Sequence, residues 1–236
     1  MKHKKIIVWS VGLVLAIVGI GLYLNQTVSV TETVIDGYEP IRDDALARRY
    51  APELLIGPEY TPPEALYYRA SRDTSNHIHI AYHYVWPYER NDADGWLPWL
   101  NRMVYTGGLG IQGTMFGKGD VEVIALEIDA DGELRVVQYE TADNYHPSDF
   151  SVQHKTVRMQ AGEFEEPLIF EVISWNHLFD YRYAGDLDPE TENQFIKLKP
   201  EYFTPELWAE YSMVKAEETR ISRNRAHLEF EREYVP

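Results

Sequence analysis

The feature that most constrains the fold is a strict alternation of side chains along residues 76–86. One set of alternate positions holds Ile78, Ile80, Tyr82, Tyr84 and Trp86, and the other holds His77, His79, Ala81, His83 and Val85. Successive side chains of a strand point to opposite faces, so this pattern predicts a β-strand with one core-facing side. The opposite side of that strand carries three histidines.

Further strands follow the same logic. Residues 120–129 alternate strongly, and Asp129-Ala130-Asp131-Gly132 predicts a turn that leads into a second strand at 133–140. Strands are also expected at 151–158 and 167–174. Near the end, Thr204 and Pro205 are typical of a helix start, and the helical pattern runs to about Asn224. The expected fold is therefore mostly β, an antiparallel β-sandwich of jelly-roll-like type with an appended C-terminal helix.

The first 25 residues predict a membrane segment. Three lysines at positions 2, 4 and 5 precede an uncharged run over residues 6–24. A helix of that length spans roughly 28 Å, close to the hydrocarbon thickness of a bilayer. We expect an uncleaved signal anchor with its basic end in the cytoplasm, which makes the chain a single-pass cell-membrane protein with an extracytoplasmic domain. A cleaved signal peptide is the alternative.

The remaining chain is expected to form one domain. Residues 26–42 are β-prone but polar and predict a stalk or an early strand. The sandwich domain is assigned to 43–202, with a short helix at 43–50 capped by Asp43 or Asp44. The C-terminal helix and tail occupy 203–236. Within this domain, the aromatic residues Trp96 and Trp99 lie in a stretch that predicts a short helix or strand.

Charge and cysteine content exclude several classes of function. The chain has 38 acidic and 22 basic side chains, and removing the three leader lysines leaves 38 against 19, a net charge of −19. An excess of acid this large disfavours nucleic acid as a partner. The absence of cysteine excludes disulfides, thiolate metal sites and cysteine nucleophiles. Extracytoplasmic proteins without cysteine are common in Gram-positive bacteria, which suggests a bacterial source.

Two carboxylates begin the strand at 120–129. Asp120 and Glu122 share a face with Ile124 and the aliphatic residues that follow it. Residues two apart on a strand lie about 6.5–7 Å from each other, so both acids would stand at the mouth of the core. Unpaired carboxylates are costly there. Either a bound cation or exposure at the rim of the sheet would remove that cost.

The same strand carries a resemblance to a known family. The segment Gly119-Asp120-Val121-Glu122 resembles the G-D-W-E strand of the necrosis-inducing (Nep-like) toxin superfamily. The segments at 50–52 with 59–63, at 83–88 and at 173–177 resemble other parts of those domains, so the similarity covers roughly residues 50–185.

The resemblance implies a β-sandwich with a divalent-cation site at one end. The family's last two metal ligands match Asp120 and Glu122, whereas its motif histidine falls on Gly117 and its tryptophan on Val121. His146 and His177 are the candidates for additional nitrogen ligands. The expected cofactor is a divalent cation (Mn, Zn, Mg or Ca), and mixed carboxylate and imidazole ligands suit Mn or Zn better than Ca.

The histidine stripe is a second candidate site. His77, His79 and His83 could bind a ligand or metal together with an acid from a neighbouring strand. The alternative is a half-solvated face on which each histidine bonds to a neighbour. Sensing of pH is a third interpretation, because histidine titrates near neutral pH.

Three functions remain open from the sequence. The first is a membrane-anchored extracytoplasmic domain that binds a divalent cation and an envelope or surface ligand, either a glycan or a lipid headgroup. The second is a metal-dependent hydrolase of envelope polymers, with Asp120 or Glu122 as ligand or base. The third is a structural or interaction domain without a small ligand. The serine-esterase and zincin signatures are absent from the sequence.

Overall fold

The computed structural model describes residues 28–105, 119–187, 192–210 and 226–234 of the chain. Strands in mainly antiparallel sheets dominate this part of the chain, which confirms the predicted β class. The predicted membrane segment at 6–24 lies outside the described residues. Among the helices that are described, none is long and apolar enough to cross a bilayer.

The larger sheet has seven strands, five of which form a meander in chain order. They are β4 (Ala65–Asp73), β5 (Ile78–Trp86), β6 (Asp120–Ile128), β7 (Leu134–Asp143) and β8 (Gln153–Gln160). The predicted strands at 76–86, 120–129, 133–140 and 151–158 are thus confirmed. The jelly-roll order is wrong for this sheet, because each of these five strands pairs with the next one in the chain; a tight turn at Asp129–Gly132 joins β6 to β7.

The remaining two strands of this sheet both join β4. They are β2 (Tyr38–Ile41), which is antiparallel to β4, and β12 (Glu201–Tyr202), which is parallel to it. A second sheet has the order β10-β9-β3-β11, in which β3 runs parallel to β9. Its strands are β3 (Glu53–Ile56), β9 (Ile169–Val172), β10 (Phe179–Arg182) and β11 (Gln194–Ile196).

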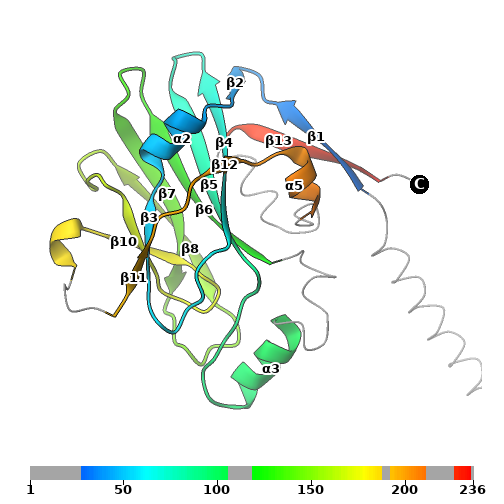
Figure 1. The fold of residues 1–236 in the computed structure, drawn as a ribbon, viewed down its shortest axis with the longest axis vertical. Helices are drawn as coiled ribbons and strands as arrows, with labels where there is room; N and C mark the ends of the chain where they lie inside the picture. The colour runs from blue at the N-terminus through cyan, green and yellow to red at the C-terminus, as the bar shows by residue number, and fades with distance from the viewer. Residues whose placement is uncertain (1–27, 106–118, 188–191, 211–225, 235–236) are drawn as a thin grey trace, which may run out of the picture.

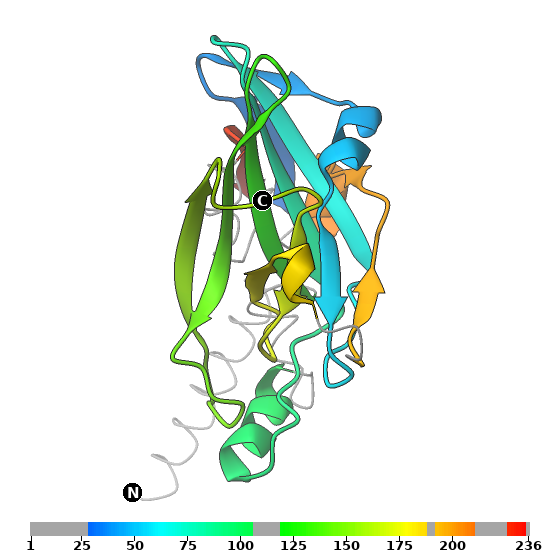
Figure 2. The ribbon, with the colours of Figure 1, turned by 90° about the vertical axis from the view of Figure 1, so that its left-hand side faces the viewer.

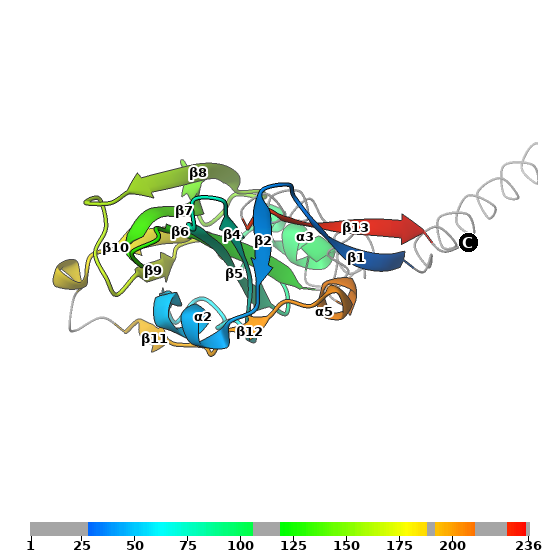
Figure 3. The same ribbon diagram turned by 90° about the horizontal axis from the view of Figure 1, so that it is seen from above.

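The main core lies between the two sheets. Its largest fully buried members come from both of them: Tyr68, Ile80, Tyr82, Tyr84, Trp86, Phe170 and Phe179. Seen from above, the strands β4 to β8 curve around β9 and β10 (Figure 3). The core-facing side predicted for residues 78–86 is therefore the side that packs against the second sheet.

A third layer covers part of the outer face of the larger sheet. The strands β1 (Val28–Val34) and β13 (Leu228–Tyr234) form an antiparallel pair, and Figure 1 shows them side by side next to α5 (Pro205–Glu210). Phe203 and Trp208 bury Tyr67, Val85 and Val121, while Ala226 packs on Ala81 and Val123. The outer face of β4, β5 and β6 is consequently buried around these residues.

This layer corrects two predictions about the ends of the domain. Residues 28–34 and 38–41 are not a stalk, because their β-prone side chains find strand partners in β13 and β4, so the alternative of an early strand applies. The predicted C-terminal helix begins at Pro205 as expected, with the Thr204 hydroxyl accepting from the Leu207 amide. Its continuation at 211–224 lies outside the described residues, and the chain that follows is strand β13.

The other helices are short. Helix α2 (Asp44–Tyr50) confirms the predicted helix, and the Asp43 carboxylate accepts hydrogen bonds from the amides of Ala45 and Leu46 at 2.9 and 3.0 Å. Helix α3 (Trp96–Tyr105) follows β5 through a loop, and η1 (Ala184–Asp186) follows β10. Figure 2 shows α3 at one end of the domain, beyond the ends of the sheets.

A buried arginine ties the third layer to the larger sheet. Arg69 of β4 is fully buried and donates to the Leu228 carbonyl of β13 at 2.9 Å. Its guanidinium also pairs with Glu32 of β1 at 3.3 Å, and the Tyr202 hydroxyl donates to the same carboxylate at 3.0 Å. A charged group removed from water needs such partners, since breaking a buried pair leaves an uncompensated charge.

Glu32→Gln tests this tie. The substitution keeps the side-chain shape but removes the charge that balances Arg69, so we expect the free energy of unfolding to fall by about 2–3 kcal/mol. Urea denaturation measures the loss. Glu39→Gln, on the exposed side of β2, is the matched control and should change stability by less than about 0.5 kcal/mol. Equal stability of both variants would contradict the role given to the pair.

Candidate functional site

Asp120 and Glu122 occupy the position that the sequence predicts. Both lie on the core-facing side of β6 at the beginning of the strand, and each residue is 7 % exposed. Strand β6 pairs with β5 along its whole length, so that Asp120 stands opposite Trp86. Its recorded pairing with β7 begins only at Ala125. The two acids therefore lie where β6 has a strand neighbour on one side only.

The loop between β9 and β10 reaches this end of β6. His177 lies in that loop, and its Nδ1 is 2.7 Å from the Asp120 carboxylate. The imidazole stacks on the Trp86 indole, with ring centres 4.4 Å apart and planes within 7°. The preceding residue, Asn176, lies 3.1 Å from Nε2 of His154 on β8. Adjacent loop residues thus contact two different strands of the larger sheet.

The backbone of this loop is a tight turn. The Ser174 carbonyl accepts from the His177 amide at 2.9 Å, and the Ser174 hydroxyl accepts from the Leu178 amide at 3.1 Å. The same hydroxyl donates to Asn176 at 2.8 Å. His177 has φ = 61°, in the left-handed region that glycine favours, which costs roughly 1 kcal/mol or more for other residues. The contacts of its imidazole with Asp120 and Trp86 offset that strain.

Burial sets the charge state of the imidazole. His177 is only 2 % exposed, and desolvation lowers its pKa to about 3. A neutral imidazole donates its Nδ1–H to the Asp120 carboxylate. His154 behaves in the opposite way: the hydrogen bond that its Nδ1 donates to the Glu140 carboxylate at 2.7 Å raises the pKa of His154. The cluster therefore combines a neutral histidine with one that favours its charged form.

The predicted four-residue metal set is not assembled. Asp120 and His177 meet, and Glu122 shares the face of Asp120, but His146 lies exposed in its own loop, with Nδ1 2.6 Å from the Ser148 hydroxyl. Over the described ranges, no group of three histidine, aspartate or glutamate side chains is placed to hold a metal ion. The cation that the resemblance implies therefore lacks a full protein ligand set in this part of the chain, and we derive no chemistry through it.

The three histidines of the stripe do not form one site. His83 is fully buried, with its ring edge-on to Phe203 at 5.1 Å and to Trp208 at 5.9 Å. The idea of a half-solvated face is wrong at this position, because α5 and the segment before it cover that part of β5. His77 is 3.5 Å from Glu127, and His79 is 3.1 Å from Asp73.

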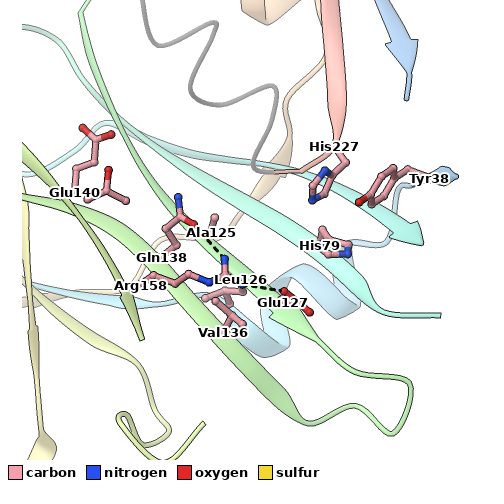
Figure 4. Close-up of a pocket in the computed structure, with 11 residues that line it drawn as sticks. Tyr38, His79, Ala125, Leu126, Glu127, Val136, Gln138, Glu140, Arg158 and His227 are labelled. Atoms are coloured by element: carbon pink, nitrogen blue, oxygen red, sulfur yellow. Dashed lines mark hydrogen bonds and ion pairs between the residues drawn. The ribbon is translucent and has the colours of Figure 1, made fainter. Parts of the chain in front are cut away.

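His79 borders a hollow that the sequence did not predict. The third layer covers parts of β4, β5 and β6 and does not extend over β7 and β8. A hollow of about 550 Å³ lies where this layer ends and the outer face of β7 and β8 begins. Its lining residues are Tyr38, His79, Ala125, Leu126, Glu127, Val136, Gln138, Glu140, Thr156, Arg158 and His227. Figure 4 shows the rings of Tyr38, His79 and His227 together on one side, with Gln138, Arg158 and Glu140 on the other.

The ring side of the hollow is a compact aromatic group. Tyr38 and His227 stack with centres 4.1 Å apart, and His79 is edge-on to both rings at 5.4 and 4.5 Å. Burial, together with the nearby His79, lowers the pKa of His227. These residues come from β2, β5 and the turn before β13. The sequence named His79 as a candidate ligand-binding residue, but no local motif could have placed Tyr38 and His227 beside it.

The other side of the hollow carries polar side chains of β7 and β8. Gln138, Glu140, Thr156 and Arg158 share the outer face of β7 and β8, since Gln138 pairs with Arg158 and Glu140 with Thr156. The Arg158 guanidinium lies 3.3 Å from Gln138 and 3.5 Å from Glu127. Alternation along 134–143 and 153–160 is the signal that could have placed these four side chains together.

Comparison with known proteins adds no further assignment. No protein-family model, no curated protein and no solved structure matches the chain. The resemblance to the Nep-like domains accordingly stays a prediction.

His177→Asn tests the charge state of the buried imidazole. The folded pKa near 3 lies below the unfolded value near 6.5, so the unfolded chain binds a proton first as pH falls. The native protein should lose about 1.4 kcal/mol per pH unit below 6.5 from this group, or about 2–3 kcal/mol by pH 4.5. Asparagine tolerates the left-handed backbone and does not titrate, so the variant should lack this part of the acid sensitivity.

Urea unfolding at pH 7 and pH 4.5 measures the difference. His146→Asn, at an exposed histidine, is the control and should keep the acid sensitivity of the unmodified protein. The opposite contribution of His154 is present in every variant and cancels in the comparison. An unchanged acid loss in His177→Asn would show that His177 is already charged in the folded protein.

Proposed function

We propose that the chain is a membrane-anchored, extracytoplasmic β-sandwich domain that binds a neutral saccharide of the cell envelope in the hollow on the outer face of β6, β7 and β8. The observation that supports this most directly is the composition of the hollow. It sets three adjacent rings opposite a set of planar hydrogen-bonding groups, within about 550 Å³. Ligand pockets are commonly about 300–1,000 Å³, which accommodates one or two sugar rings.

The charges around the hollow favour a neutral ligand. Glu127 lies near both Arg158 and His77, and Glu140 pairs with His154. Each carboxylate thus has a basic neighbour, and neither needs a cationic ligand to balance it. Hydroxyl groups both donate and accept, so they match a surface on which carboxylate, amide and guanidinium groups alternate. The apolar face of a sugar ring suits the amphipathic rings of tyrosine and histidine.

The overall charge separates the two ligand classes that the sequence leaves open. The net charge of the chain is −16, and −19 without the three leader lysines. An anionic lipid headgroup or polymer would approach against this field, whereas a neutral glycan would not. The glycan is therefore the better-supported ligand. The uncharged run at 6–24 would hold the domain at the outer surface of the membrane, where such polymers lie.

A divalent cation at Asp120 and Glu122 is the second candidate. What favours it is the placement of two buried carboxylates on one face of β6, with the His177 imidazole against Asp120. His177 is the nearest nitrogen ligand, and waters would have to complete the coordination, as they often do around magnesium. A metal-dependent hydrolase would need this same cation and would also have to turn over a substrate, so it is less well supported than binding alone.

Titration with a saccharide tests the first candidate. We expect N,N′,N″-triacetylchitotriose at up to about 10 mM to shift the amide NMR signals of β7, β8 and Tyr38 in the full chain in detergent micelles. Arg158→Ala should weaken binding about tenfold, because it removes the guanidinium that links Gln138 and Glu127. Lys155→Ala, exposed on the opposite face of β8, is the control and should leave the affinity unchanged.

Maltotriose serves as a second neutral probe in the same titration. Shifts at the hollow with either sugar support the proposal, and the preference between them reports which ring substituents are recognised. Shifts that miss these residues, or no shift with either sugar, would contradict it.

Thermal unfolding with added cations tests the second candidate. Mn²⁺, Zn²⁺, Mg²⁺ or Ca²⁺ at saturating concentration should raise the melting temperature by several degrees if Asp120 and Glu122 bind it, because a ligand of the native state stabilises it. The double variant Asp120→Asn/Glu122→Gln should lose this rise. A melting temperature that none of the four ions changes would exclude a bound cation at this place.

A further inference from the structure

Helix α3 (Trp96–Tyr105) leaves two tryptophans exposed while it buries a polar side chain. Trp96 is 72 % exposed and Trp99 is 55 % exposed, whereas Asn101 is fully buried. A surface helix of a globular protein normally buries its large apolar residues and exposes its polar ones. Single exposed hydrophobic residues are common, but neighbouring exposed tryptophans on one helix face form a contiguous apolar patch, which usually marks an interaction site.

Hydrogen bonds hold the polar side of α3 in place. The Asn101 amide donates to the Phe150 carbonyl at 2.7 Å. The Arg102 guanidinium donates to the carbonyls of Asn91 and Ala93 at 2.6 and 3.0 Å. These contacts satisfy groups that would be costly to bury alone, so the orientation of the helix is fixed by specific bonds.

An apolar stripe runs along one side of the helix; its two tryptophans are exposed, and Leu100 and Met103 are half-buried. Trp96, Trp99, Leu100 and Met103 are spaced i, i+3, i+4 and i+7, which places them within one arc about 100° wide. Leu97, 37 % exposed, extends the arc at one side. Figures 1 and 2 show α3 projecting beyond the sheets, so the stripe is presented at the tip of the domain.

We infer that this stripe, hereafter the α3 stripe, docks on the surface of an electrically neutral lipid bilayer and inserts Trp96 and Trp99 at its interface. Tryptophan is the residue type most characteristic of the membrane–water boundary, and an apolar helix face lying in that plane is the usual form of such contacts. The inference rests on the proposed membrane anchor.

The size of the α3 stripe favours a bilayer over a protein partner. A ten-residue helix is about 15 Å long and offers five apolar side chains, whereas a stable protein interface uses 20–30 residues a side. Such a small surface binds effectively only when the domain is already held close to its target. The predicted span ends at Leu24, four residues before β1 begins at Val28, so the link is at most about 14 Å long.

The charges near the α3 stripe identify the kind of bilayer. Asp92 and Asp94 in the preceding loop are exposed, and Arg90 already pairs with Asp92 at 2.6 Å. Arg102, the basic residue of the helix itself, bonds to backbone carbonyls on the inner side. Among the described residues of α3 and the loop before it, no basic side chain faces outward without an acidic partner, unlike in the amphipathic helices that bind anionic lipids. A zwitterionic surface such as phosphatidylcholine is the expected target.

Quenching of tryptophan fluorescence by brominated lipid tests the inference. The full chain, carrying Trp9→Phe to remove the tryptophan of the predicted span, is placed in phosphatidylcholine vesicles with and without lipid brominated near the headgroup. Of the five remaining tryptophans, Trp86, Trp175 and Trp208 are buried in the protein. We expect the brominated lipid to reduce the emission, and Trp96→Ser/Trp99→Ser to abolish that reduction without changing the melting temperature.

Controls separate this inference from the proposed anchor. Tyr183→Ser, at an exposed aromatic residue after β10, should leave the quenching unchanged. Flotation of the vesicles reports whether the chain is anchored at all. A chain that floats but is not quenched overturns docking of the α3 stripe and leaves the anchor intact, whereas a chain that does not float overturns both. An oligomer that Trp96→Ser/Trp99→Ser dissolves would assign the stripe to a second copy and also overturn the inference.

Discussion

The ladder between β5 and β6 is the constraint on which the rest of the structure depends. It runs without a break from the pair Ile78–Ile128 to the pair Trp86–Asp120, and its inner face and part of its outer face are covered. On the inner face it supports the core shared with the second sheet. On the outer face it provides the surface on which α5 and β13 pack. Because the register is fixed over this length, Asp120 is brought beside Trp86, and the His177 imidazole can contact both of them.

Local pattern was sufficient to predict the strands of this ladder and the hairpin that follows it. Alternation and turn residues depend on neighbours within a few positions, which is why β5, β6 and β7 were found within two or three residues of their observed ends. The pairing of β1 with β13 joins segments about 200 residues apart and has no local signal. The same limit explains why residues 26–42 were assigned to a stalk.

The candidate sites show the same contrast between local sequence pattern and contacts distant in sequence. Asp120 and Glu122 could be placed on one buried face from spacing alone, and His177 could be named but not positioned, because its contact with Asp120 spans 57 residues of chain. The histidine stripe shows the converse error. Three histidines on the same face of one strand have three different environments. The third layer covers His83, ends at His79 and leaves His77 beside Glu127.

The incomplete third layer gives the domain the first of its two exposed features of chemical interest. Because β1, β13 and α5 cover only β4 to β6, the outer faces of β7 and β8 remain open beside the rings of Tyr38 and His227, and a hollow forms at the boundary. Helix α3, which leaves the end of β5, is fixed through its polar side and therefore presents its tryptophans to the exterior. If the proposed N-terminal anchor and the inferred docking of α3 both hold, the domain has two fixed points on the bilayer. Together they would hold the hollow at a constant orientation to the surrounding envelope.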